Sequence, residues 1–212
     1  MDMLAAIAQG IPLTIGVTVA SFALAAVAGV PLVLGLRSPR ALVRVPIRAV
    51  VDLVRSIPIL VWIFLLYFGL SVGGFRLDNL QAAILALGGV SAAYLAEVYR
   101  GAIESVDPGQ WEAGRALALS PTETFTKVIA PQAVRVALPS ATTFALTLLK
   151  DSSIPSVIGV AEISHFTLAE SRATGQGLTA FTTAVVLYIV LSVPIALLSR
   201  YLDHRMRRKV AR

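Results

Sequence analysis

Residues 10–36 read GIPLTIGVTVASFALAAVAGVPLVLGL, a stretch without one charged side chain. A helix needs about 20 mostly apolar residues to cross the hydrocarbon core of a bilayer. This stretch is long enough, and it is too long for the apolar core of a signal peptide. Residues 10–36 therefore predict a membrane-spanning helix.

The whole chain has the composition of a protein that lives in lipid. Of its 212 residues, 57% are hydrophobic and only 14% are charged, whereas a soluble domain carries about 25% charged residues. So much apolar surface cannot be hidden inside a domain of this size. We expect an all-α polytopic membrane protein formed by a single domain, residues 1–212.

Four more apolar stretches bring the expected number of crossings to five. The further spans are predicted at 49–70, 80–98, 136–163 and 178–198. Span 136–163 is interrupted by Lys150, Asp151, Ser152 and Ser153, because residues 136–149 alone are too short to cross. An odd number of crossings puts the two termini on opposite sides of the membrane.

The basic residues orient the chain. They cluster in the first connection (37–48), in the connection 100–135 and in the tail from residue 200 onward. The other side holds only Arg76 and Arg172, and Arg55 and Lys150 lie inside spans. Cytoplasmic loops carry the excess of Lys and Arg in membrane proteins. The sequence therefore predicts an N-terminus outside, a C-terminus in the cytoplasm, and basic side chains that contact anionic lipid headgroups rather than nucleic acid.

Several kinds of chemistry are excluded by composition. The chain has no cysteine, and its two histidines, His165 and His204, are far apart in sequence. None of its three lysines follows the glycine of a phosphate-binding P-loop. We therefore expect no metal, no cofactor, no ATP site and no enzymatic activity in this chain.

The connection 100–135 carries two helix-start signals. Asp107-Pro108-Gly109-Gln110 and Ser120-Pro121-Thr122-Glu123 each place a capping residue before proline, with Gln or Glu at the third helical position. This is the pattern of a capping box. It predicts a rigid helix of about three turns over Trp111 to Leu119, held at the cytoplasmic face.

This loop, GQWEAGRALALSPTETFTKVIAPQAVRVALPS, resembles the EAA signature of ABC importer permeases. Glu112, Ala113 and Gly114 match the opening triplet, with Gly in place of the second Ala, and Ala118 stands where the family usually has Gly. The stretches VRSIPILVWIFLLYFGL, AAYLAEVYRGAIESVDPGQWEAGRAL and LLKDSSIPSVIGVAEI are similar to the polar amino-acid branch of that family.

The resemblance implies the permease fold of a type I importer in a prokaryotic inner membrane. Its implied partners are an ABC ATPase dimer, a second permease subunit that is a copy or a paralogue, and an extracytoplasmic amino-acid-binding protein. The residues expected to couple the permease to the ATPases are Gln110, Trp111, Glu112, Ala113, Gly114, Leu117 and Ala118. The alternative is that this helix is an ordinary solvated surface helix.

Charged and helix-breaking residues inside the spans are the candidates for a substrate pathway. Such groups are costly in lipid and mark transport routes, and a broken helix exposes polar groups that suit a zwitterion. The candidates are Arg55, Pro58, Glu97, Lys150, Asp151, Ser152, Ser153 and Glu162. Structural alternatives remain for each: an Asp52–Arg55 ion pair, a Glu97–Arg100 pair, an ordinary loop at 150–153, and an interfacial position for Glu162.

Two other classes of protein are compatible with a helical membrane domain. A stand-alone, ion-driven carrier needs no ATPase, but such folds often show inverted repeats, and none is visible here. A structural membrane subunit would explain the small residues, but neither the capped cytoplasmic helix nor the charged break. An ATP-driven importer of a polar amino acid accounts for both.

Overall fold

The computed structural model describes residues 2–69, 74 and 76–210, and within these ranges the chain is helical and has no strand. The helices are α1 (Met3–Ala8), α2 (Ile11–Leu36), α3 (Ala41–Ser56), α4 (Ile59–Phe64), η1 (Leu65–Gly69), α6 (Asn79–Glu104), α7 (Pro108–Ala116), α8 (Pro121–Glu123), η2 (Thr124–Ile129), α9 (Ala130–Asp151), η3 (Ile154–Ile158), α10 (Ile163–Thr174) and α11 (Gly177–Val210).

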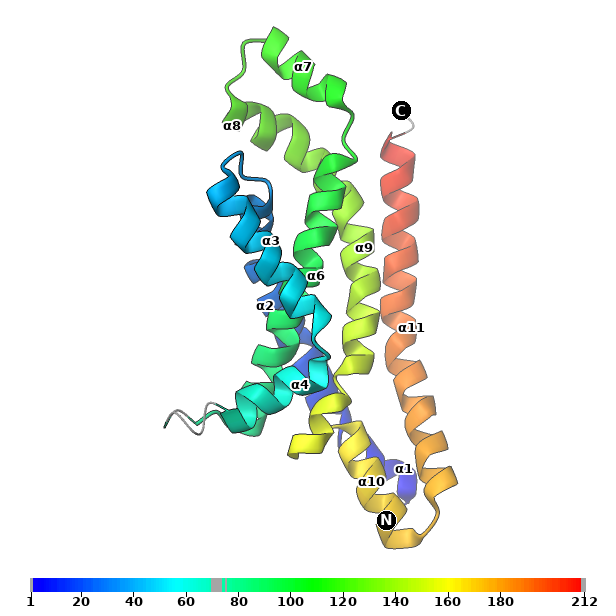
Figure 1. Cartoon of the computed structure of the whole chain (residues 1–212). Coiled ribbons are helices and arrows are strands. Elements are labelled where there is room, and N and C mark those ends of the chain that lie inside the picture. Colours follow the sequence, from blue (N-terminus) through cyan, green and yellow to red (C-terminus); the bar gives the residue numbers. More distant parts are fainter. Residues whose placement is uncertain (1, 70–73, 75, 211–212) are drawn as a thin grey trace.

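The helices form an elongated bundle with two distinct ends (Figure 1). The N-terminus, α1 and α10 lie at one end, and α7, α8 and the C-terminal end of α11 lie at the other (Figure 1). Within the described residues, three helical stretches are long and apolar enough to cross a membrane, and two bent pairs bring the number to as many as five. The opposite placement of the termini is what an odd number of crossings requires.

Small residues set the close contact between α2 and α6 at the centre of the bundle. Gly29 of α2 lies against Ala92 and Tyr99 of α6, where an added Cβ would stand 3.3 Å from the Ala92 carbonyl oxygen. Ala25 and Ala92 are both buried in the same interface. The hydrophobic effect does not drive helices together in lipid, because lipid tails are as apolar as the side chains. The close approach of the two backbones instead stabilises the α2–α6 contact through van der Waals packing.

The second span, predicted at 49–70 with Pro58 inside it, begins earlier and bends sharply at that proline. Helix α3 begins at Ala41, inside the segment expected to be a connection, and the chain then bends by 99° into α4 and η1. The bend lies at Ile57, whose backbone is extended (φ −94°, ψ 130°). Pro58 follows it, and a residue before proline is pushed out of the helical conformation. Leu70, the expected end of this span, lies outside the described residues.

The helix that contains residues 136–149 begins earlier than the predicted fourth span, and it ends at Asp151, within the predicted interruption at 150–153. Helices α8, η2 and α9 follow one another directly, so that helical structure runs from Pro121 to Asp151. The change of direction, 53°, lies between η3 and α10 instead of at Lys150. Pro139 is tolerated inside α9, since neighbouring groups can satisfy the freed carbonyl.

The remaining spans are longer than their apolar cores. Helix α6 continues to Glu104 and α11 to Val210, beyond the predicted limits of 98 and 198. Apolar patterning marks the lipid-embedded part of a helix, and the polar turns that extend it lack that signal. Of the basic tail, Arg212 lies outside the described residues.

Candidate functional site

Helix α7 is the exposed helix that the loop signals predicted, but it is shorter and starts earlier. It spans Pro108–Ala116 rather than Trp111 to Leu119. The Asp107 carboxylate caps it by accepting a hydrogen bond of 2.7 Å from the Gly109 N–H. Gln110 does not complete a capping box, because its side-chain oxygen accepts from Gln132 instead (3.2 Å). That bond ties the start of α7 to α9.

The second capping box is confirmed. The Ser120 hydroxyl accepts from the Glu123 N–H (3.2 Å), and the Glu123 carboxylate accepts from the Ser120 N–H (3.1 Å). Lys127, one turn on, lies 2.9 Å from the same carboxylate. These bonds, first of all that from Lys127, lower the pKa of Glu123 from 4.5 to about 2. Because the charged form is favoured in the folded chain, this stabilisation is complete above pH 4.5 and is lost only as the pH falls towards 2.

One face of α7 packs on the chain and the other faces outward. Trp111 stacks on Phe125 with ring centroids 6.4 Å apart, and both border a buried cluster around Ile129. Glu112 and Leu117 are exposed, Leu117 by 73%. Trp111 therefore braces α7 against η2, and the outward surface is formed by its neighbours. We name the segment Pro108–Ile129 the docking loop.

Gly114 fixes the distance between α7 and η2. Its position is buried, and an added Cβ would lie 2.5 Å from Cγ2 and 2.7 Å from Oγ1 of Thr124. We expect Gly114→Ala to push α7 away from η2 and to destabilise the docking loop by about 1–3 kcal/mol, the usual cost of overpacking. Limited proteolysis within 108–129 measures the effect. The pair Gly114→Ala with Thr124→Ala should restore protection, and equal cleavage of wild type and Gly114→Ala contradicts this packing.

Ala118 ends the helix in an unusual backbone conformation. Its φ is +53°, the left-handed region, and no other non-glycine residue among those described has a positive φ. A left-handed residue just past the last turn is a common way to end a helix, and glycine is the residue that adopts it without strain. The departure from glycine at this position therefore keeps the turn and costs the chain some stability.

A cavity of about 400 Å³, lined by polar as well as apolar side chains, lies where the α3–α4 break meets the middle of α6 and the end of α9; it is called the polar cavity below. Arg55 and Pro58 line it from the break, Ser91 and Tyr94 from α6, and Asp151 from α9. The volume is in the range of small-ligand pockets. Asp151 is thus brought next to Arg55 and Pro58, two other residues proposed from sequence as a pathway, although it is distant from them in sequence.

Arg55 is held by an aromatic stack on one wall of this cavity. Its guanidinium carbon lies 4.9 Å from the centroid of the Tyr94 ring. Tyr94 in turn stacks on Phe144 of α9, with centroids 5.7 Å apart and an interplanar angle of 26°. Among the described residues, no ion pair joins Arg55 to Asp52. The guanidinium therefore rests on a ring face, with its N–H donors free of a local carboxylate.

The other residues of the charged break do not face the cavity. Lys150 is exposed and is not among the lining residues. Ser152 is fully buried and donates to the Leu149 carbonyl, and Ser153 donates to the Lys150 carbonyl, each at 2.7 Å. Neither serine side chain caps the following helix η3, because both hydroxyls satisfy the last carbonyls of α9 instead.

Glu97 lies in an ion-pair network, away from the cavity. Its carboxylate is 3.1 Å from Arg48 of α3 and 2.8 Å from Arg100 of its own helix, and its side chain is 15% exposed. Burial of the Glu97 carboxylate costs desolvation free energy, and the attraction of the two guanidinium groups compensates this cost. The pair with Arg100 was an alternative from sequence, whereas the bond to Arg48, which ties α3 to α6, was not foreseen.

Glu162 is fully buried at the far end of the bundle. Its carboxylate caps α10 by accepting from the His165 N–H (2.9 Å) and accepts a second bond from the Tyr188 hydroxyl of α11 (2.7 Å). Both contacts are the kind that hold a helix junction together. Glu162 joins α10 to α11 and does not line the polar cavity.

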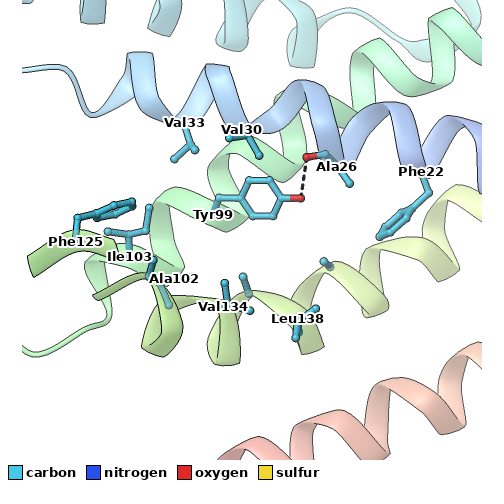
Figure 2. Close-up of a pocket in the computed structure, with 14 residues that line it drawn as sticks. Phe22, Ala26, Val30, Val33, Tyr99, Ala102, Ile103, Phe125, Val134 and Leu138 are labelled. Atoms are coloured by element: carbon cyan, nitrogen blue, oxygen red, sulfur yellow. Dashed lines mark hydrogen bonds between the residues drawn. The ribbon is translucent and has the colours of Figure 1, made fainter. Parts of the chain in front are cut away.

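A second cavity, of about 420 Å³, is apolar (Figure 2). Side chains of α2, α6, η2 and α9 surround it, and Tyr99 reaches across it to donate a 3.3 Å hydrogen bond to the Ala26 carbonyl (Figure 2). Because that hydroxyl is already satisfied, the walls offer nothing to a charged ligand. Of these two cavities, the one at Arg55 and Asp151 is suited to a zwitterion.

Comparison with known proteins identifies the family. Residues 21–208 match the family described as "Binding-protein-dependent transport system inner membrane component". The chain belongs to this family. It is therefore a multi-pass inner-membrane component, and membership implies ATPase subunits, which carry out ATP hydrolysis, and a second permease subunit.

Individual relatives of this binding-protein-dependent permease agree with that assignment. It is 35% identical to the probable amino-acid ABC transporter permease YckA of Bacillus subtilis, over 87% of this chain and 82% of that protein. It is 34% identical to the arginine ABC transporter permease ArtQ of Haemophilus influenzae, over 77% of each. A crystal structure of an amino acid ABC transporter with histidines matches with a TM-score of 0.90 and 27% identity, over 97% of this chain and 99% of that one. The fold of the permease is thus the type I importer fold.

Sequence reasoning missed the aromatic and hydroxyl residues of the cavity. Ser91, Tyr94, Phe144 and Thr147 line it together with the residues named above. In sequence, these residues look like ordinary members of apolar spans. The available signal was helical spacing, since Ser91 and Tyr94 lie three apart on one face of a span.

Proposed function

We propose that the chain is the permease subunit of an ATP-driven importer that moves a polar amino acid into the cytoplasm. The amino-acid permeases among its relatives and the polar cavity at membrane depth support this substrate class. An extracytoplasmic binding protein would deliver the amino acid at the α10 end. ATP hydrolysis on partner subunits would supply the energy, so this chain performs no covalent chemistry.

One observation carries the coupling mechanism: helical structure runs without a break from Pro121 in the docking loop to Asp151 in the cavity wall. At 1.5 Å per residue this run is about 45 Å long. The capping box and the Trp111–Phe125 stack fix α7 to its start. A displacement of α7 by an ATPase would therefore move the cavity wall as part of one rigid body.

The proposed coupling surface is the outward side of α7 and of the turn that follows it. It comprises Glu112, Ala113, Leu117 and Ala118, all of them exposed. Gln110, Trp111 and Gly114 would act from beneath, by holding this surface against α9 and η2. The basic residues near this end support a cytoplasmic position for it and for the C-terminus, with the N-terminus outside.

Reconstitution tests the proposed function. The permease, its ATPases and its binding protein are placed in vesicles, and uptake of a labelled amino acid is measured with ATP on the ATPase side. We expect uptake to require ATP and the binding protein and to persist when ion gradients are collapsed. Uptake that follows an ion gradient without ATP indicates a stand-alone carrier, and absence of uptake with all components indicates a structural subunit.

A further inference from the structure

The charges of the polar cavity balance. Of the described residues that line it, Arg55 and Asp151 are the charged ones, one cation and one anion. The remaining polar groups, such as Ser91 and Thr147, are uncharged hydroxyls. The cavity borders the middle of α6, a helix long and apolar enough to cross a membrane, and a charge within a membrane span is costly. Arg55 is exposed on this side of the chain, and Asp151 is half-buried.

The cation and the anion come from opposite elements. Arg55 belongs to the last turn of α3, and its guanidinium lies on Tyr94. Asp151 is the last residue of α9. In the described structure Arg55 forms no ion pair with Asp151. Each charge is therefore available to a ligand that carries the opposite one.

We propose that this cavity selects amino acids of zero net charge, with Arg55 binding the carboxylate, Asp151 binding the ammonium, and Tyr94 and Phe144 positioning the guanidinium. The inference rests on the proposed function and adds the substrate class. A zwitterion with an uncharged side chain neutralises both groups and leaves no charge over. A cationic or anionic side chain adds a charge that no lining residue matches, and burial of an unpaired charge is strongly unfavourable.

The aromatic stack fixes the position of the Arg55 guanidinium at the wall of the cavity. A planar guanidinium on a ring face keeps its edge donors available, and these match a carboxylate in a bidentate fashion. Phe144 in turn stacks on the Tyr94 ring. Tyr94 and Phe144 are thus positioning residues that act through Arg55, so the ring matters and the Tyr94 hydroxyl does not.

Binding to the purified permease–ATPase complex, without the binding protein, tests the substrate class. Calorimetric titrations compare L-glutamine with L-arginine, L-glutamate and L-glutaminamide, which lacks the carboxylate. We expect glutamine to bind at least about tenfold more tightly than the other three, a difference that one unpaired charge in the cavity supplies. Equal affinity for arginine or glutamate overturns the inference, and so does a wild-type complex that binds none of the four.

Charge variants sharpen the test. Asp151→Asn leaves the cavity with a net positive charge and should raise the affinity for glutamate relative to glutamine. Arg55→Gln leaves a net negative charge and should raise the relative affinity for arginine. An unchanged order of preference in both variants contradicts the assignment of the two charges.

The positioning role has its own control. Tyr94→Phe should retain glutamine affinity, whereas Tyr94→Leu should weaken it about tenfold, with glutaminamide unaffected because it has no carboxylate to lose. Tyr201→Leu is the matched control, since Arg205 lies 6.0 Å over that exposed ring, far along α11. Equal effects of Tyr94→Leu and Tyr201→Leu overturn the role of the stack. If ATP-dependent uptake persists while these preferences fail, the inference is wrong and the proposed function stands.

Discussion

Replacing Glu112 with arginine is expected to abolish ATP-driven uptake while the chain still inserts into the membrane. Glu112 is exposed on α7, and among the described residues it makes no ion pair. Reversal of its charge therefore leaves the fold intact and changes only the surface offered to an ATPase. We expect uptake in reconstituted vesicles to fall more than about tenfold, the cost of losing one dominant interface contact.

Two variants of equal charge change serve as controls. Glu112→Gln, which removes a negative charge, and Thr122→Arg, which adds a positive one, each raise the net charge of the docking loop by one. Thr122 is also exposed but lies outside α7. We expect Glu112→Gln to lower uptake in part and Thr122→Arg to retain it. Normal transport by Glu112→Arg, with the protein inserted, removes α7 from the coupling mechanism.

The second large effect is expected at Asp151. Asp151→Ala should abolish the stimulation of ATP hydrolysis by amino acid and binding protein, because it removes one of the two charges that line the cavity. Lys150→Ala, the neighbouring position, should leave that stimulation within about twofold of wild type, since exposed surface substitutions have small effects. The measurement is the substrate dependence of ATPase activity in the assembled complex.

The informative outcome is a difference in ATPase stimulation between the Asp151→Ala and Lys150→Ala variants. Loss of stimulation in both variants would indicate that the end of α9 matters as a structural element rather than through one carboxylate. Identical kinetics of Asp151→Ala and wild type would exclude a direct role for the carboxylate.

The membrane spans could be predicted because lipid imposes one simple requirement, a long apolar helix. Prediction failed where the chain departs from that requirement. Helix α3 carries arginines along its length, so its composition indicated a loop, although Arg48 and Arg55 find partners on α6. A contact between helices that are distant in sequence leaves no mark in the local pattern.

The candidate site was predictable to a similar extent. The charged residues and the proline inside the spans were visible as exceptions to apolar composition, and three of them meet in one cavity. Whether a charge faces a cavity, a neighbouring guanidinium or a helix end depends on tertiary packing. Glu97 and Glu162 are both paired in junctions, and no sequence period distinguishes them from Asp151.

Crosslinking from the outward face of α7 tests the central claim most directly. The chain contains no cysteine, so Glu112→Cys and Leu117→Cys each introduce a unique thiol at an exposed position. The account predicts that a short thiol-to-amine crosslinker joins these positions to an ATPase subunit and that a membrane-impermeant thiol reagent added outside intact cells does not reach them. Labelling from outside, or crosslinks that never include an ATPase, would contradict it.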